Sequence, residues 1–520
     1  MIQDNKWGKI FIRLITILFT VIIASLTYMS FFEHCMTDIH NFLQTRYIDI
    51  HQPVLYVGLA CVGTVFGMGM IHFTTIMLSK STDGWKTVQR ILIACCGLVC
   101  LASIFWIFFN DATPKYDQMV LFKEARIMAG YIDEPYNIQN FELMPRNKGL
   151  TLLMALMLRL LGDSMVSFRI LNVLGAVVLL IYVSLTTKKV WKNQAVTVAT
   201  SILLTIYYPI IIYTCYLYGT LLSAAFGALG VYAIICYCEN NELKYILIAL
   251  FSFPFAIQMH QSAAIVLIAA IFYLLMHVTK ETTGKAIICV VLFVVMIFSF
   301  NKMADWSFKK VTGVEELGDG VPTLAYFYMG ISAGDGAGGP GSQDGTFVEI
   351  FLENNRDVKA TNRDAMNRII KVLSEYISGE RDLKFFVDKV KFQWLDPTFG
   401  SRRIIESNYV ENGEPPNSEA YLRVRNSSWR NVGFRIAVVG LITTYGLNLV
   451  AAIYQIVKKE QDGLHFFIQI LLIGGFTFQL VWESISRYCF SYFIWLLPGA
   501  AYGMVLLYKV IFNIINRRTE

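Results

Sequence analysis

Charged residues are scarce in this chain, which excludes an ordinary soluble globular protein. Asp, Glu, Lys and Arg make up 16% of the 520 residues, and 55% of the residues are hydrophobic. A soluble protein carries about a quarter charged residues, so the composition predicts an integral membrane protein. The net charge of +6 is small and fits basic cytoplasmic loops. No basic cluster is interleaved with aromatic residues, which excludes a nucleic-acid partner.

Motifs for metal and nucleotide binding are also missing. The ten cysteines lie mostly inside or beside apolar runs, where free cysteine is a packing residue. The pair Cys236 and Cys238 is too close and too isolated for a zinc site. The glycine-rich segment 334–345 lacks the Gly-Lys-Ser/Thr ending of a phosphate-binding loop. A divalent metal ion is compatible with the chain, but its ligands are unknown.

Long apolar runs predict about twelve transmembrane helices, since each helix needs roughly 20 apolar residues. The runs are 11–32, 54–78, 91–109, 166–185, 195–213, 217–236, 245–259, 262–277, 286–300, 434–457, 466–481 and 488–514. The first run has no small-residue cleavage site, which indicates a retained anchor. The chain therefore divides into a membrane module at 1–300, a large loop at 301–433 and C-terminal membrane helices at 434–520.

The placement of lysine and arginine predicts the orientation of these helices, because cytoplasmic loops are enriched in both. With the N-terminus and Lys80 inside, the loop at 110–165 lies outside. Leu150–Leu161 is apolar but short and contains Arg159. Read as an external surface helix rather than a span, it leaves every later basic loop inside. The loop at 301–433 is then external too, with mixed structure and two predicted helices, at 362–377 and 384–394.

Polar side chains from several connections gather on this predicted external face. Asp111 and Asp117 follow the third apolar run, where carboxylates are readily hydrated but expensive to bury. The others are Arg146, Lys148, Tyr213, Tyr216, Gln258, His260, Glu483 and Arg487. A carboxylate can accept a hydroxyl proton, and cations can bind a phosphate. The set therefore suits a reaction on a charged, lipid-borne substrate.

Each of these residues also has a structural interpretation. Asp111 could solvate a helix end, and Asp117 could cap the helix that follows it. His260 could be a structural hydrogen-bonding residue. Glu483 and Arg487 are four residues apart and could pair only with one another. The tyrosines could belong to the aromatic belt of the membrane interface.

Several short motifs carry a resemblance to a known family. They are Asp117-Gln118, Met144-Pro145-Arg146-Asn147-Lys148-Gly149, Phe168-Arg169-Ile170-Leu171-Asn172, Tyr326-Phe327-Tyr328-Met329-Gly330, Lys391-Phe392-Gln393-Trp394 and Trp482-Glu483 with Ser486-Arg487-Tyr488. Together they resemble the GT-C fold glycosyltransferases, especially the protein O-mannosyltransferase-like type (family 39 and relatives) of Gram-positive bacteria. Many relatives have Asp-Glu at the first motif, where this chain has Asp-Gln.

The resemblance implies an all-α, polytopic GT-C fold with juxtamembrane helices in the first external loop. It implies transfer of a monosaccharide from a polyprenyl-phosphate (undecaprenyl-phosphate) carrier to a glycan, teichoic acid or protein acceptor, outside a bacterial plasma membrane. Asp117 aligns with the general base of that family, and Asp111 is the second candidate. The donor phosphate is expected to contact Arg487, Lys148, His260 and Arg146. The sugar and acceptor pocket is expected to include Glu483, Tyr213, Tyr216, Tyr326 and Tyr328.

Two other functions are compatible with the sequence. A flippase or exporter of lipid-linked sugar would also be polytopic, but transporters commonly show inverted repeats and broken mid-membrane helices. This chain shows no repeat, and its notable charges lie near one surface. A non-catalytic partner that keeps the fold is the third alternative.

Overall fold

The computed structural model describes residues 6–37, 45–49, 53–110, 114, 117–277, 282–314, 318–332, 335–336, 339–401, 429–458, 463–483 and 485–519. Helices dominate these residues. Two short antiparallel hairpins accompany them, β1 (Glu33–Thr37) with β2 (Thr45–Asp49), and β3 (Asp335–Gly336) with β4 (Gly339–Pro340). The predicted helical class is confirmed.

Nine helices of the described residues are long and apolar enough to cross a bilayer. They are α1 (Lys6–Phe32), α2 (Pro53–Ser79), α3 (Gly84–Phe109), α7 (Met165–Trp191), α10 (Thr220–Asn240), α13 (Thr283–Thr312), α20 (Trp429–Lys458), α21 (Gly463–Val481) and α22 (Phe490–Thr519). Three shorter apolar helices lie among them, α8 (Gln194–Ile206), α11 (Leu243–Met259) and α12 (Ala263–Met276). The chain is thus a multi-pass membrane protein. These helices correspond in sequence to the twelve predicted spans, but how many cross the membrane stays a prediction. The run predicted at 195–213 is not one helix, because α8 ends at Ile206 and a short helix, α9 (Pro209–Tyr213), follows it beside α3 and α7.

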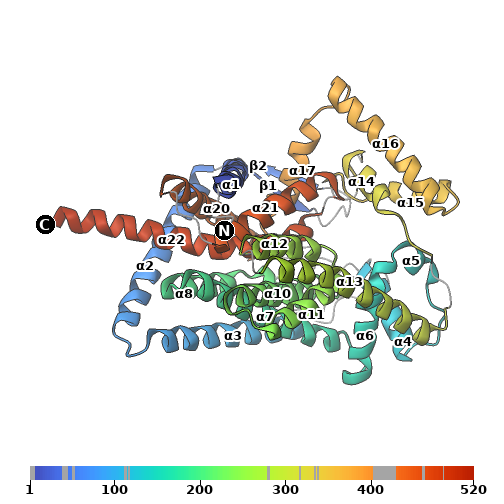
Figure 1. The fold of residues 1–520 in the computed structure, drawn as a ribbon, viewed down its shortest axis with the longest axis horizontal. Helices are drawn as coiled ribbons and strands as arrows, with labels where there is room; N and C mark the ends of the chain where they lie inside the picture. The colour runs from blue at the N-terminus through green and yellow to red at the C-terminus, as the bar shows by residue number, and fades with distance from the viewer. Residues whose placement is uncertain are drawn as a thin grey trace.

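Most of the other helices gather at one end of the bundle, on the right of Figure 1. This loop end carries α4 (Asp117–Ala129), α5 (Ile138–Leu143), α6 (Lys148–Leu161), α14 (Thr323–Ser332), α15 (Thr346–Glu353), α16 (Val358–Ser378) and α17 (Lys384–Trp394). The C-terminus and the turn between α2 and α3 lie at the opposite end (Figure 1). The two loops predicted to be external therefore share one end.

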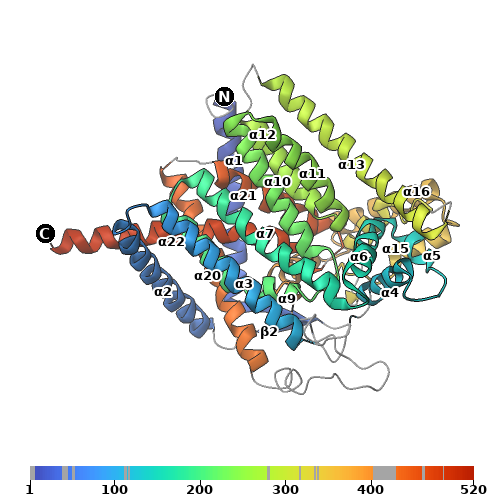
Figure 2. The ribbon, with the colours of Figure 1, turned by 90° about the horizontal axis from the view of Figure 1, so that it is seen from below.

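Helix α6 lies across the direction of the long helices (Figures 1 and 2). Its buried positions include Leu150, Met154 and Leu158. Arg159, which is unfavourable inside a bilayer, donates to the Met128 carbonyl of α4 at 2.5 Å. The helix is therefore packed on α4 and α7 at the loop end, and its place outside the membrane stays a prediction.

Helix α13 is longer than the sequence predicted. The apolar run ends at Phe300, but the helix continues to Thr312. Its last turns are amphipathic: Phe308 is buried against Phe141 of α5, with ring centroids 4.7 Å apart. The predicted boundary at residue 300 consequently lies inside a helix that projects into the loop end.

Candidate active site

A buried guanidinium marks the loop end of the bundle. Arg487 belongs to the short 3-10 helix η2 (Ser486–Cys489) that joins α21 to α22. One of its nitrogens lies 3.8 Å from Oδ2 of Asp117, and another donates to the Tyr216 hydroxyl. The Arg487 side chain is 14% exposed, whereas that of Asp117 is 46% exposed. A largely buried cation thus lies beside a carboxylate that remains open to solvent.

Three tyrosine rings surround this cation. The guanidinium carbon lies 5.9 Å from the ring centroid of Tyr216, 5.1 Å from that of Tyr218 and 5.5 Å from that of Tyr488. Aromatic faces attract a cation at such distances. The predicted pairing of Glu483 with Arg487 through helix spacing is not what the structure shows, because Arg487 faces Asp117 and this tyrosine cluster instead.

Hydrogen bonds at the start of α4 place Asp117 opposite the tyrosines. Helix α4 begins at Asp117 itself. The next residue, Gln118, accepts a hydrogen bond from the Leu217 backbone N–H at 3.0 Å. Asn172 of α7 donates to the Tyr216 carbonyl at 2.8 Å. The amide of Gln118 therefore ties α4 to the turn that carries Tyr216, a role that uses an uncharged side chain at this position.

A second turn supports Arg487 from the opposite side. Asp396 is 5% exposed, and its Oδ2 accepts hydrogen bonds from the Gly400 N–H at 2.8 Å and the Ser486 hydroxyl at 2.7 Å. In the same turn, the Phe399 carbonyl accepts a hydrogen bond from Tyr213. Tyr213 is 1% exposed, so it supports the site from below and does not line an open pocket. Its hydroxyl is already used within the protein, and its predicted contact with sugar or acceptor stays a prediction.

Arg146 supplies a second cation beside a buried carboxyl group. Its guanidinium carbon lies 4.8 Å from the Tyr326 ring centroid, and this ring stacks on Trp482 at 5.6 Å. Glu483 is 4% exposed and accepts a hydrogen bond from the Tyr488 hydroxyl at 3.2 Å. Burial raises the pKa of Glu483, and the charges of Arg146 and Arg487 oppose that rise. Arg146, Tyr326 and Glu483 thus join the group around Arg487.

His260 lies in the same group but does not supply the positive charge expected of it. Its ring centroid is 5.3 Å from that of Tyr488, and its Nδ1 accepts the Ser262 N–H at 3.3 Å. Burial, followed by repulsion from Arg487 and Arg146, lowers the pKa of His260 to about 3. The imidazole is therefore neutral near pH 7 and can only donate or accept hydrogen bonds.

Other predicted residues lie elsewhere. Lys148 forms an ion pair with Asp305 of α13, so its charge is already neutralised. Tyr328 packs beside α16, with the Arg368 guanidinium 6.0 Å from its ring. Asp111 lies outside the described residues. Among the residues that the structure describes, no three His, Cys, Asp or Glu side chains form a group that could hold a metal ion.

Several residues of the site were missed from the sequence. Tyr218 lies beside Arg487, and Asp396 lies in a turn to which no motif was assigned. Gln118 and Tyr488 belong to the quoted family motifs, but neither was given a role in the site. Tyr218 stands in a tyrosine-rich stretch two residues after Tyr216, which is the signal that could have found it. The contact of Asp396 with Ser486 spans 90 residues and leaves no local signal.

Comparison with known families identifies a related family model over part of the chain. Residues 149–302 match the family model of the dolichyl-phosphate-mannose-protein mannosyltransferases. The match confirms the predicted mannosyltransferase-like resemblance and agrees with the predicted GT-C glycosyltransferase fold. The matched stretch contains Asn172, Tyr216 and His260, whereas Asp117 and Arg487 lie on either side of it. No curated protein sequence matches the chain significantly.

Solved structures show distant similarity over most of the chain. The archaeal oligosaccharyltransferase AglB from Archaeoglobus fulgidus, in complex with an inhibitory peptide and a dolichol-phosphate, is 11% identical over 84% of this chain and 52% of that chain, with a TM-score of 0.42. The apo form of the Archaeoglobus fulgidus oligosaccharyltransferase is 14% identical over 82% and 52%, with a TM-score of 0.41. ArnT from Cupriavidus metallidurans, bound to undecaprenyl phosphate, is 11% identical over 81% and 78%, with a TM-score of 0.32. The chain spans about half the length of the two oligosaccharyltransferase structures.

Proposed function

We propose that the chain is a GT-C glycosyltransferase that moves a monosaccharide from a polyprenyl-phosphate carrier to a hydroxyl acceptor. The observation that carries this proposal is the Arg487–Asp117 pair, a largely buried guanidinium 3.8 Å from a half-exposed carboxylate. It is supported by the match of residues 149–302 to a family named for a sugar donor linked to a lipid phosphate. The loop end would face the outside of a bacterial plasma membrane.

Asp117 has the position and exposure required of a general base. Its carboxylate would accept the proton of the acceptor hydroxyl. The oxygen would form a bond to the anomeric carbon of the sugar, while the bond from that carbon to the carrier phosphate breaks. The bonding electron pair leaves with the phosphate, and attack from the opposite face inverts the anomeric centre.

Arg487 would bind the phosphate that departs. The phosphate gains negative charge as the bond breaks, and a guanidinium already held in place stabilises that charge without rearrangement. A planar guanidinium also donates two parallel hydrogen bonds to phosphate oxygens. Arg146 would add a second positive charge, which the ion-paired Lys148 and the neutral His260 do not provide.

Glu483, Tyr216, Tyr326 and His260 would contact sugar hydroxyls. The Glu483 carboxyl group already accepts a hydrogen bond from the Tyr488 hydroxyl, and it would exchange further hydrogen bonds with the sugar. The acceptor is defined here only by its hydroxyl group, which a glycan, a teichoic acid and a protein Ser or Thr side chain all supply.

The variant Asp117→Asn tests the proposed base. General-base catalysis contributes about 10²–10⁴-fold, so we expect sugar transfer in reconstituted vesicles to fall by at least about 10²-fold. Glu134→Gln is the matched control, because Glu134 is an exposed carboxylate of the same loop that pairs with Lys123 at 2.5 Å. Transfer by Asp117→Asn at the rate of the control would exclude Asp117 as the base.

The same assay separates the three candidate functions. A synthetic polyprenyl-phosphate sugar is supplied with and without acceptors, and release of the free lipid phosphate is measured. Release that depends on an acceptor and on Asp117 supports the glycosyltransferase. Movement of the intact donor across the vesicle membrane without any cleavage would instead establish a flippase. If neither cleavage nor movement is observed, the non-catalytic partner is the remaining alternative.

A further inference from the structure

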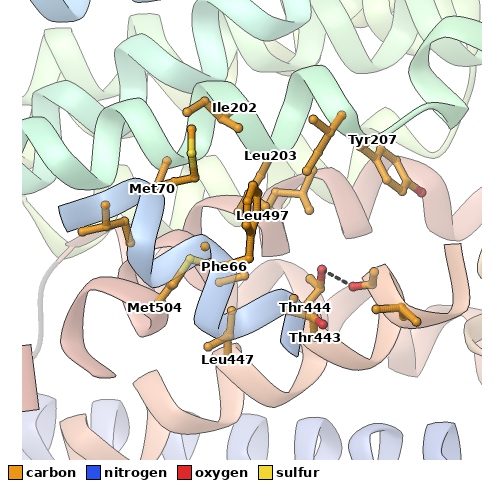
Figure 3. Close-up of a pocket in the computed structure, with 18 of the residues that line it drawn as sticks. Phe66, Met70, Ile202, Leu203, Tyr207, Thr443, Thr444, Leu447, Leu497 and Met504 are labelled. Atoms are coloured by element: carbon orange, nitrogen blue, oxygen red, sulfur yellow. Dashed lines mark hydrogen bonds between the residues drawn. The ribbon is translucent and has the colours of Figure 1, made fainter. Parts of the chain in front are cut away.

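The membrane part of the bundle presents two different kinds of surface. Helices α2, α8, α20 and α22 line an apolar hollow (Figure 3), whose walls include Phe66 and Leu203. The Thr444 hydroxyl there donates to the Gly440 carbonyl of its own helix at 2.7 Å, and the residues that line the hollow are uncharged. The outer end of α13, residues 301–312, differs because it carries exposed positive charge.

Helix α13 lies on the flank of the bundle and runs towards the loop end (Figure 2). It has 30 residues, which gives a length of about 45 Å, whereas the hydrocarbon core of a bilayer is about 30 Å thick. Its exposed side is apolar from Ile287 to Phe298. The helix is therefore long enough to cross the hydrocarbon and to continue into the headgroup region.

Beyond Phe298 the same exposed side becomes basic and aromatic. Lys302 lies one turn after Phe298, with its Nζ 5.5 Å from the phenyl centroid. Lys310 lies one turn after Trp306, with its Nζ 5.1 Å from the indole centroid. These four residues are spaced four apart, so they share one face of the helix. Trp306 is 61% exposed, and this face therefore points away from the protein.

The opposite side of these turns is held by the protein. Asn301 accepts a hydrogen bond from the Gln258 side chain of α11, and Asp305 forms an ion pair with Lys148 of α6. Phe308 is buried. Asp305 is the only acidic residue of α13, so its pairing with Lys148 leaves the positive charge of the exposed side unbalanced within the helix.

Two ordinary explanations cover only part of this pattern. Lys309 and Lys310 lie in the last turn, where they complement the negative end of the helix dipole, but Lys302 lies well before that end. The lysine bias of membrane proteins favours the cytoplasmic side, whereas this end is predicted to be external. Lys302 in particular is left to contact a ligand of opposite charge.

We propose that the exposed side of α13 from Lys302 to Lys310 binds the headgroups of anionic phospholipids. The apolar residues before Lys302 face hydrocarbon, an exposed tryptophan is typical of the membrane interface, and lysine side chains attract an anionic leaflet. Along one helix face, these features follow the order in which a bilayer presents hydrocarbon, interface and phosphate. That order favours lipid over a soluble anionic polymer, which would need neither the tryptophan nor the apolar approach.

Quenching of tryptophan fluorescence tests this contact, since Trp306 is the only exposed tryptophan among those whose side chains the structure describes. Full-length protein is reconstituted in vesicles of equal parts phosphatidylglycerol and phosphatidylcholine, with bromine on the acyl chains of one lipid or the other. Subtracting the signal of Trp306→Phe in each background isolates Trp306. The variant Lys302→Gln with Lys310→Gln removes two charges from this face. Lys359→Gln with Lys371→Gln is the matched control, because both lysines are exposed on α16.

We expect brominated phosphatidylglycerol to quench Trp306 more strongly than brominated phosphatidylcholine. One lysine near an anionic surface contributes about fivefold in binding. Loss of Lys302 and Lys310 should therefore lower the preference for phosphatidylglycerol by at least about fivefold. The control on α16 should keep the preference, and high salt should weaken it in the wild type.

Other results would overturn the assignment of this face to anionic lipid. Equal quenching by the two lipids would leave Trp306 as an interfacial residue without selectivity for headgroups. Absence of quenching by either lipid would show that protein, such as a second copy of the chain, covers the face. Displacement of phosphatidylglycerol by soluble polyglycerol phosphate would assign the lysines to an anionic polymer. Equal losses in the α13 and α16 variants would reduce the effect to net charge. None of these measurements depends on sugar transfer.

Discussion

Arg487 shows how much the identity of one side chain matters at this site. Its guanidinium contacts Asp117, hydrogen-bonds Tyr216 and lies among three tyrosine rings. Lysine would keep the charge but lose the planar fork and the stacking. We expect Arg487→Lys to lower kcat by about 10²-fold, near the loss of one preorganised electrostatic donor, with a smaller change in KM.

The control for this prediction is Arg126→Lys, because Arg126 pairs with Asp163 at 2.6 Å in a partly exposed position of the same loop end. Both variants are assayed for sugar transfer at saturating donor. If Arg487→Lys is as fast as Arg126→Lys, positive charge alone suffices at residue 487. This result would exclude the proposed bidentate contact with phosphate.

Sequence reasoning reached part of this site because the charge rule and the family resemblance pointed to the same residues. The charge rule placed Asp117 and Arg487 on one face, and the structure brings them within 3.8 Å. The prediction that Lys148 contacts the donor phosphate failed, because its partner, Asp305, lies beyond the end of the apolar run, where a helix boundary was expected. Sequence reasoning also failed for the charge of His260, because a burial-dependent pKa is a property of the tertiary environment.

At the scale of elements, the site depends on the large loop between α13 and α20. Lys389 of α17 is fully buried, and its Nζ donates to the Gly330 carbonyl of α14 and to the Trp482 carbonyl, the latter at 2.6 Å. Trp482 immediately precedes Glu483. One ammonium group therefore joins α17 and α14 to the turn that carries the site, a contact between segments more than 50 residues apart that periodicity alone does not reveal.

This joint predicts a pH-dependent stability. Burial lowers the pKa of Lys389 to about 7 from its usual 10.5, although Glu483 opposes the change. Between these values the unfolded chain holds a proton that the folded chain releases, so stability rises with pH across this window and is flat below it. The slope from this group is at most about 1.4 kcal/mol per pH unit. We expect the difference in Tm between the wild type and Lys389→Met to shift in favour of the wild type as the pH rises from about 7 to about 9.

Lys384→Met is the control for that experiment, since Lys384 is an exposed residue of the same helix. At pH 7, Lys389→Met leaves two buried carbonyl groups without their donor, and each lowers the free energy of unfolding by about 1–3 kcal/mol. Because these carbonyl groups hold the turn that carries the site, we also expect the variant to lose activity. Parallel Tm profiles for the wild type and Lys389→Met would show that the ammonium is not titrating in this range.

At the scale of the whole molecule, the sequence predicted the elements better than their ends. Eleven of the twelve apolar runs coincide with one long or medium helix each, and the run at 195–213 divides into α8 (Gln194–Ile206) and α9 (Pro209–Tyr213). Hydrophobic length is a signal that acts over many residues, whereas a break at one proline is local. The extension of α13 to Thr312 was missed because its amphipathic last turns pack on the loop end. Such packing depends on α5 and α6, which become neighbours only when the loop folds back.

The orientation of the bundle is the whole-molecule property on which the proposed function depends. Asp133 is exposed in the loop end, and Thr82 is exposed in the turn between α2 and α3 at the opposite end. In intact cells we expect a membrane-impermeant maleimide to label Asp133→Cys, and to label Thr82→Cys only after permeabilisation. The wild type with Cys35→Ser is the background and the control, since among the nine cysteines whose side chains the structure describes only Cys61 is exposed, within the apolar helix α2. The reverse labelling pattern would place Asp117 and Arg487 in the cytoplasm, where an acceptor in the cell envelope could not reach them.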